Sequence, residues 1–169
     1  MNTMVVYDSL YGNTEKVAQA IAGAMPPFGA VRALRVGEAN LTALESTDLL
    51  IVGSPTHGGR ATPAIQEFIN KIPAGGLKTV RVIAFDTRIS AEDKGIGLRF
   101  LMRLLGYAAG RIANRLRAKG GSLAAPPAGF IVEGKEGPLK EGELERATAW
   151  AVRIIGQQEH ALVAQQGEP

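Results

Sequence analysis

The chain has 169 residues, a formal net charge of +3 and no cysteine. Its length suffices for one domain with a buried core, and 46% hydrophobic residues exclude a disordered chain. The missing cysteines exclude disulfides and thiolate metal sites, and the small net charge does not predict a nucleic-acid partner. Neither a run of about 18 apolar residues nor a signal-peptide core is present, so we expect a cytoplasmic protein without a membrane span.

Short apolar runs alternate with segments whose apolar residues recur at helical spacing. In chain order, the pattern predicts a strand at 4–7, a helix at 13–24, strands at 30–36 and 48–53, a helix at 63–72, a strand at 79–85, a helix at 96–119, a strand at 130–132 and a helix at 144–164. Thr62 is the expected N-cap of the second helix, and Gly120-Gly121 is expected to end the third. The predicted domain therefore comprises residues 1–164, and residues 165–169 are expected to form a frayed tail.

This alternation predicts an α/β fold with a parallel sheet and right-handed crossovers. Five strands in the order 2-1-3-4-5, with helices on both faces, give a doubly wound three-layer α/β/α arrangement. The winding direction reverses between the first and third strands, and ligands bind at such switch points. We therefore expect the functional chemistry at residues 8–14 and 54–60.

The loop between the first strand and the first helix is rich in hydroxyl groups. A strand that enters a helix through such a loop directs backbone N–H groups and the positive end of the helix dipole at one point. The pattern predicts an anion site suited to a phosphate, although an ordinary strand-to-helix turn with polar caps is the alternative. The candidate residues are Ser9, Leu10, Tyr11, Gly12, Asn13 and Thr14.

The spacing of this loop resembles the phosphate loop of flavodoxins. An apolar run ending in an aromatic residue is followed by Ser9, Gly12, Thr14 and Ala18 at the matching intervals. The dinucleotide-binding pattern G-x-G-x-x-G and the P-loop pattern are both absent here. The resemblance implies a flavodoxin-like fold with a bound FMN whose phosphate lies on this loop. Flavodoxins are usually strongly acidic, whereas this chain carries a net charge of +3.

A second loop, after the third strand, matches the flavodoxin loop that flanks the flavin ring. By this resemblance, Ser54 and Thr56 contact phosphate or ribityl oxygens, His57 flanks the ring, and Gly58 provides a peptide that can flip when the flavin is reduced. The alternative for His57 is an ordinary surface histidine, and a metal site is not predicted. The residues assigned to the site are Ser54, Pro55, Thr56, His57, Gly58 and Gly59.

A third loop, which begins with Asp86, Thr87 and Arg88, is expected to face the pyrimidine end of the flavin. Backbone amides and the Thr87 hydroxyl would recognise the edge of the ring. Arg88 would favour the anionic reduced flavin, or it is an ordinary solvated arginine. Residues 86–94 contain no aromatic side chain to cover the flavin.

Basic residues recur along the predicted helix at 96–119. The simplest interpretation is a solvent-exposed face, and docking of an acidic partner or an anionic surface is the alternative. The pattern from Gly106 to Gly110 in the same helix suggests packing against a second subunit, and therefore a homodimer. The basic residues are Arg99, Arg103, Arg111, Arg115, Arg117 and Lys119.

The resemblance implies an FMN-binding electron-transfer protein that serves redox partner proteins or a small-molecule electron acceptor. Such a protein needs no catalytic side chain, because the flavin carries the redox chemistry. Two alternatives stay open. One is an FMN-dependent NAD(P)H:quinone or small-molecule reductase, and the other is a flavodoxin-like interaction domain that has lost its flavin.

Overall fold

The computed structural model describes the backbone of residues 1–90, 96 and 107–166, and side chains as far as residue 156. A parallel sheet with the strand order β2-β1-β3-β4-β5 forms its centre, which confirms the predicted order. A sixth segment, β6, also pairs with β4. The strands are β1 (Asn2–Tyr7), β2 (Ala30–Arg35), β3 (Leu49–Pro55), β4 (Arg81–Ile89), β5 (Ser122–Leu123) and β6 (Ala128–Val132).

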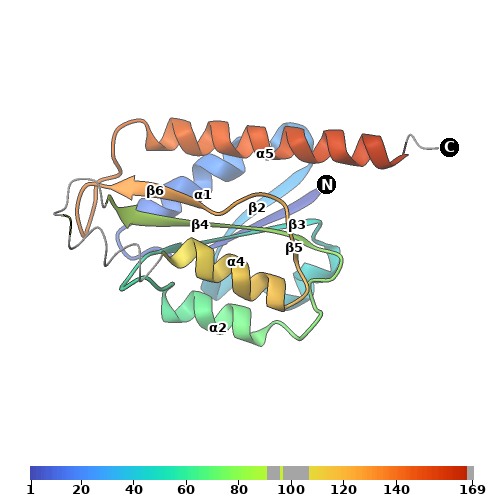
Figure 1. The fold of residues 1–169 in the computed structure, drawn as a ribbon, viewed down its shortest axis with the longest axis horizontal. Helices are drawn as coiled ribbons and strands as arrows, with labels where there is room; N and C mark the ends of the chain where they lie inside the picture. Colours follow the sequence, from blue (N-terminus) through green and yellow to red (C-terminus); the bar gives the residue numbers. More distant parts are fainter. Residues whose placement is uncertain (91–95, 97–106, 167–169) are drawn as a thin grey trace.

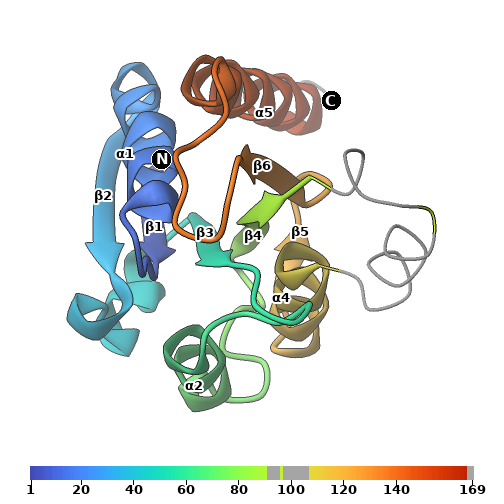
Figure 2. The same ribbon diagram turned by 90° about the vertical axis from the view of Figure 1, so that its left-hand side faces the viewer.

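Helices cover both faces of the sheet, so the predicted three-layer α/β/α fold is confirmed. Helices α1 and α5 lie on one face, and α2 and α4 lie side by side on the other (Figures 1 and 2). Within the described part of the chain, no helix is long and apolar enough to cross a membrane. The helices are α1 (Asn13–Gly23), α2 (Pro63–Lys71), α4 (Ala108–Ala118) and α5 (Glu143–Gln166), with short 3-10 helices at Pro26–Phe28, Val36–Glu38 and Leu41–Ser46.

The strand side chains alternate between two apolar cores, one on each face of the sheet. In β1, Met4 and Val6 pack in the core beneath α2 and α4, and Val5 and Tyr7 pack in the core beneath α1 and α5. This period of two is what a strand buried on both faces requires. The sheet is therefore a rigid support for the loops at the ends of its strands.

Two predicted elements differ in the structure because of strand pairing. Strand β4 continues to Ile89, since Asp86 and Thr87 pair with β3 while residues 85–89 pair with β6. The predicted loop that begins at Asp86 is therefore wrong, because these residues lie in the sheet. The fifth strand position is divided into β5 and β6, with Pro126 and Pro127 between them, because proline has no N–H to donate to a ladder.

Two predictions about helix ends also need correction. Tyr107 has extended backbone angles, φ −124° and ψ 160°, and α4 begins at Ala108, so a continuous helix over 96–119 is wrong. Thr62 occupies the N-cap position of α2, but its hydroxyl makes no capping hydrogen bond. Gly120, with φ +101°, follows the end of α4 as expected. The predicted features at Arg99, Arg103 and Gly106 lie outside the described residues.

Candidate functional site

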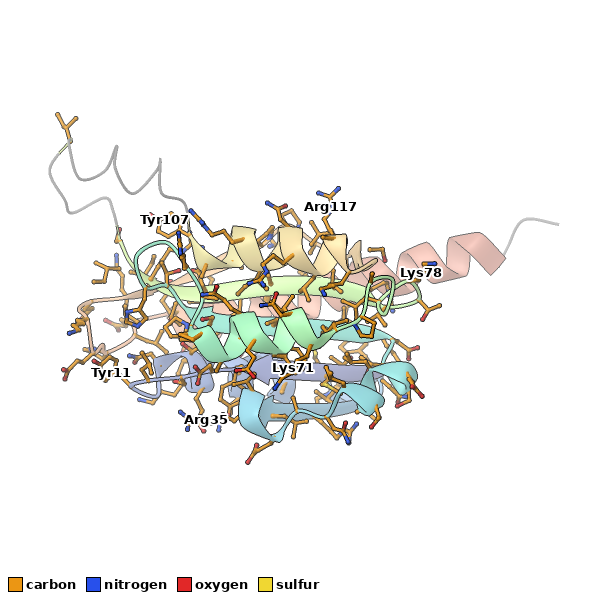
Figure 3. All side chains as sticks on the ribbon, turned by 90° about the horizontal axis from the view of Figure 1, so that it is seen from below. Tyr11, Arg35, Lys71, Lys78, Tyr107 and Arg117 are labelled. Atoms are coloured by element: carbon orange, nitrogen blue, oxygen red, sulfur yellow. The ribbon has the colours of Figure 1, made fainter. Side chains whose placement is uncertain are left out.

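A pocket of about 100 Å³ lies at the carboxyl ends of β1, β3 and β4, where the predicted switch point falls. Figure 3 shows Tyr11 and Tyr107 at this end of the molecule. The structure brings together most residues that the sequence assigned to the site. The pocket is lined by Ser9, Leu10, Tyr11, Asn13, Thr14, Pro55, Thr56, His57, Thr87, Arg88, Ile89, Val132 and Lys135.

The first loop presents unused backbone donors to this pocket. Among the described residues, the N–H groups of residues 10–14 donate to no protein acceptor. The next two donors are satisfied: Glu15 N–H reaches Ser9 Oγ at 3.3 Å, and Lys16 N–H reaches the Gly12 carbonyl at 3.0 Å. A helix start with unpaired N–H groups in a pocket is the arrangement that binds anions.

Gly12 makes the abrupt turn from this loop into α1. Its φ is +82°, in the left-handed region that other residues adopt only at a cost. A Cβ at this position would meet no other atom within 4 Å. The glycine is therefore required by its backbone conformation, and the space beside it is open.

Contacts from distant segments hold the first loop in place. The Arg35 side chain donates to the Ser9 carbonyl, and its Nε lies 3.9 Å from the Asp8 carboxylate. The Asn13 amide donates to the Glu136 carbonyl at 2.9 Å. Thr14 Oγ1 lies 2.8 Å from Thr87 Oγ1, which ties the start of α1 to the end of β4.

The second loop divides into an internal and an external part. Ser54 is fully buried, and its hydroxyl accepts from Thr62 N–H at 2.9 Å, so it supports the loop and does not line the pocket. His57 is exposed and lines the pocket. The backbone groups of His57 and Arg60 exchange two hydrogen bonds of 2.9 Å across Gly58 and Gly59.

Gly58 and Gly59 are the central residues of this turn. Their φ values are +54° and +75°, the pair of positive values that a type I′ turn requires. Neither glycine lines the pocket itself. They set the position of His57 at its rim.

Asp86 lies beneath the pocket and does not line it. Its carboxylate is fully buried, and it accepts from Arg88 Nε at 2.5 Å, Ala109 N–H at 2.8 Å and the Thr56 hydroxyl at 3.0 Å. Burial raises the pKa of this carboxyl above its ordinary value, and the Arg88 guanidinium and the two other donors only partly offset this. Its oxygen atoms are used inside the protein, so Asp86 supports the pocket from beneath and is not among the residues that line it.

Arg88 is neither a solvated arginine nor an isolated charge. Besides its ion pair with Asp86, its guanidinium lies 3.7 Å from the centre of the Tyr107 ring. It also crosses Gly129, where a Cβ would approach the guanidinium to 2.2 Å. An aromatic residue from just before α4 thus packs against Arg88, which lines the pocket, and the sequence of residues 86–94 does not reveal this contact.

Three further residues line the pocket that sequence reasoning missed: Ile89, Val132 and Lys135. Ile89 lay in a segment predicted as loop, and Val132 was assigned to a strand without a functional role. Lys135 is an exposed cation in the loop after β6. No motif marks it, because only the pairing of β6 with β4 brings this loop beside the first one.

A family model described as flavodoxin domain matches residues 4–124. A protein named as a diflavin flavoprotein, from Synechocystis, is 37% identical over 84 residues. The match covers 47% of this chain and 14% of that protein, so the chain corresponds to a small part of that relative's length.

Solved structures show the same fold at low sequence identity. A flavodoxin from the domain Archaea superposes with a TM-score of 0.72 at 19% identity, covering 95% of this chain and 100% of that one. Flavodoxin 1 from Bacillus cereus superposes with a TM-score of 0.71 at 16% identity, covering 92% of this chain and 98% of that one. The flavodiiron core of Flv1 from Synechocystis superposes with a TM-score of 0.70 at 23% identity, covering 95% of this chain and 36% of that one.

Proposed function

The chain belongs to the flavodoxin family, whose fold implies a flavin cofactor, and on that premise we propose that it is an electron-transfer protein that binds FMN non-covalently. The observation that carries this proposal is the group of unused N–H donors of residues 10–14 at the start of α1, where four of the five residues line the pocket. A phosphate dianion would accept from several of them at once, with the helix dipole adding to the attraction.

The hydroxyl groups around the loop also suit a phosphate. Ser9 Oγ accepts from Glu15 N–H, which leaves its own O–H to donate. In the Thr14–Thr87 pair one hydroxyl donates to the other, so one O–H stays available for a ligand. The Lys135 ammonium adds a positive charge at the rim.

Residues from three segments would orient the rest of the cofactor. Tyr11 and His57 are exposed at the rim and would flank the ring, while Thr56 and Thr87 line the pocket between them. When bound, the flavin supplies the redox chemistry, and these residues hold it and limit its contact with water. Residues 1–164 would act as one cytoplasmic flavin-binding domain.

Electron transfer is favoured over the alternative reductase. The relatives described above are flavodoxins and flavodiiron proteins, and no observation on the described residues indicates a nicotinamide site. The flavin-free interaction domain is disfavoured by the intact anion loop. A homodimer stays a prediction. A Cβ at Gly110 would meet open space, so no close approach within this chain explains that glycine, and Gly106 lies outside the described residues.

The test is to titrate the flavin-free protein with FMN and with riboflavin, following the quenching of flavin fluorescence. Riboflavin lacks the phosphate, so we expect it to bind at least about 100-fold more weakly, because hydrogen bonds to a charged group contribute about 1.5–3 kcal/mol each. Equal affinities would refute the phosphate role of the first loop. Rapid oxidation of NADH or NADPH by the FMN-loaded protein would favour the reductase instead.

A further inference from the structure

One arginine on the edge strand β2 holds the backbone of the first loop from outside the pocket. Arg35 is the last residue of β2 and pairs with Tyr7, the last residue of β1, so it lies where the first loop begins. Arg35 and Tyr11 accordingly lie toward the same end of the molecule (Figure 3). The Arg35 side chain donates to the Ser9 carbonyl, but Arg35 is not among the residues that line the pocket.

The peptide unit between Ser9 and Leu10 transmits this contact to the pocket. The peptide is trans, and the C=O and N–H groups of a trans peptide point in opposite directions. Since the carbonyl points to Arg35, the Leu10 N–H points away from it. Leu10 lines the pocket, and its N–H donates to no protein acceptor among the described residues. The contact with Arg35 therefore favours the orientation in which this N–H is available to a ligand.

The residue before this peptide is fixed as well, so the orientation has two supports. The Asp8 N–H donates to the Gly53 carbonyl at 3.1 Å, and Asp8 Oδ1 accepts from the Ser9 N–H at 2.9 Å. Both backbone groups of Ser9 are thus satisfied, the N–H by Asp8 and the carbonyl by Arg35. A loop whose donors are oriented before the ligand arrives loses less entropy when it binds.

Arg35 also offsets a carboxylate beside this loop. Its Nε lies 3.9 Å from Asp8 Oδ1, and the Asp8 side chain is only 13% exposed. Without the guanidinium, a largely buried negative charge would stand close to the N–H groups that are to bind a phosphate dianion. The orientation of the peptide and the local charge therefore both act on an anionic ligand.

We infer that Arg35 is a positioning residue for the flavin phosphate, because it holds the Ser9 carbonyl so that the Leu10 N–H faces the phosphate. The inference rests on the proposed binding of FMN, and it names a residue that makes the site select a phosphorylated flavin. Arg35 acts through the backbone of Ser9 and not by lining the pocket.

The test compares the binding of FMN and riboflavin to the full chain, by quenching of flavin fluorescence. We expect Arg35→Gln to bind FMN about fivefold more weakly, as for the loss of one hydrogen bond, and riboflavin within about twofold of the wild type. Arg35→Lys keeps a charged donor and should recover part of the loss. An equal loss for both flavins would overturn the inference, because Arg35 would then only support the fold.

Arg32→Gln is the matched control for net charge. Arg32 is an exposed arginine of the same strand, and it does not line the pocket. Its replacement should change the affinity for FMN less than about twofold. A loss as large as that of Arg35→Gln would overturn the inference, because a general attraction between a basic chain and an anion would then explain both.

A further comparison separates the orientation of the peptide from the local charge. Asp8→Asn removes the carboxylate but keeps an acceptor oxygen for the Ser9 N–H. Adding Arg35→Gln to Asp8→Asn should still weaken FMN binding, since the Ser9 carbonyl loses its donor in both backgrounds. If no further loss occurred, Arg35 would only neutralise Asp8, and its positioning role would be refuted.

The outcomes for this inference and for the proposed function are distinct. Equal affinities of the wild type for FMN and riboflavin would refute the phosphate role of the first loop itself. A wild type that prefers FMN, with the same preference in Arg35→Gln, would overturn only the role of Arg35. Urea unfolding of every variant identifies any change in flavin affinity that comes from a loss of folded protein.

Discussion

The two sides of the proposed flavin pocket differ in how their polar groups are used. On one side, the first loop keeps the N–H groups of residues 10–14 unpaired among the described residues. On the other side, the end of β4 uses its polar groups within the protein: Asp86 binds Arg88, Thr56 and Ala109. The first loop is thus prepared to bind a ligand, whereas the end of β4 is a support.

This difference separates the expected effects of substitutions. A change in the first loop should weaken FMN binding more than it weakens folding. A change in the Asp86 network should destabilise the fold first, because a buried ion pair that loses one member leaves an uncompensated charge. Four predictions test the distinction.

The largest effect is expected for Asp86→Ala. The substitution removes the acceptor of Arg88, Thr56 and the Ala109 N–H, and breaking a buried pair in this way costs about 3–5 kcal/mol. Urea unfolding followed by circular dichroism would measure the loss. Asp86→Asn, which keeps an acceptor oxygen for Ala109, should lose clearly less. A loss below about 1 kcal/mol for Asp86→Ala would show that the network is not a support.

The pH dependence of stability should have opposite signs at two carboxylates. The folded-state pKa of Asp86 is raised, chiefly by burial, so its folded form holds the proton more tightly and its contribution to stability falls as the pH rises above the ordinary 3.8. Burial also acts to raise the pKa of Glu143, but the Arg146 side chain and the Ile131 N–H outweigh it and lower that pKa. The contribution of Glu143 is therefore present above the ordinary 4.5 and is lost as the pH falls.

Unfolding free energies of the wild type, Asp86→Asn and Glu143→Gln between acid and neutral pH would test these signs. The wild type should lose stability relative to Asp86→Asn as the pH rises. Relative to Glu143→Gln it should gain stability over the same rise. The same slope in both comparisons would contradict the assignment.

The contrast between the first loop and the end of β4 also explains what the sequence could predict. The pattern of the sequence predicts the first loop because its signals are local: an apolar strand, hydroxyls, Gly12 and a helix within a short stretch. The alternation of elements also gave the strand order. For the end of β4 the sequence predicts a loop, which is wrong because the extension of this strand depends on pairing with β3 and β6. Lys135 lines the pocket, and Tyr107 packs on Arg88, through tertiary packing alone, so no spacing along the chain could reveal either contact.

An intermediate effect is expected for Gly12→Ala. A Cβ would meet no atom of the protein, so the cost comes from the φ of +82°, roughly 1–2 kcal/mol for a residue with a side chain. Because the loop can escape this strain by changing its shape, FMN affinity should fall as well. Gly23→Ala is the matched control: its Cβ also meets open space, but Gly23 is the last residue of α1 and has no positive φ, so alanine should not destabilise the protein there. Fluorescence titration and urea unfolding of both variants would distinguish backbone strain from the loss of a glycine as such.

The smallest effect is expected for Lys135→Gln. Lys135 is exposed at the rim, so a single screened charge should contribute about 0.3–1 kcal/mol to holding a phosphate, a twofold to fivefold change in FMN affinity. Riboflavin affinity should not change, since no phosphate is present, and the effect on FMN should disappear at high salt. Lys140→Gln, in the same loop but outside the pocket lining, should leave both affinities unchanged. If Lys135→Gln weakened riboflavin binding as much as FMN binding, the Lys135 side chain would act on the shape of its loop. Phosphate binding would then depend on the backbone donors of the first loop alone.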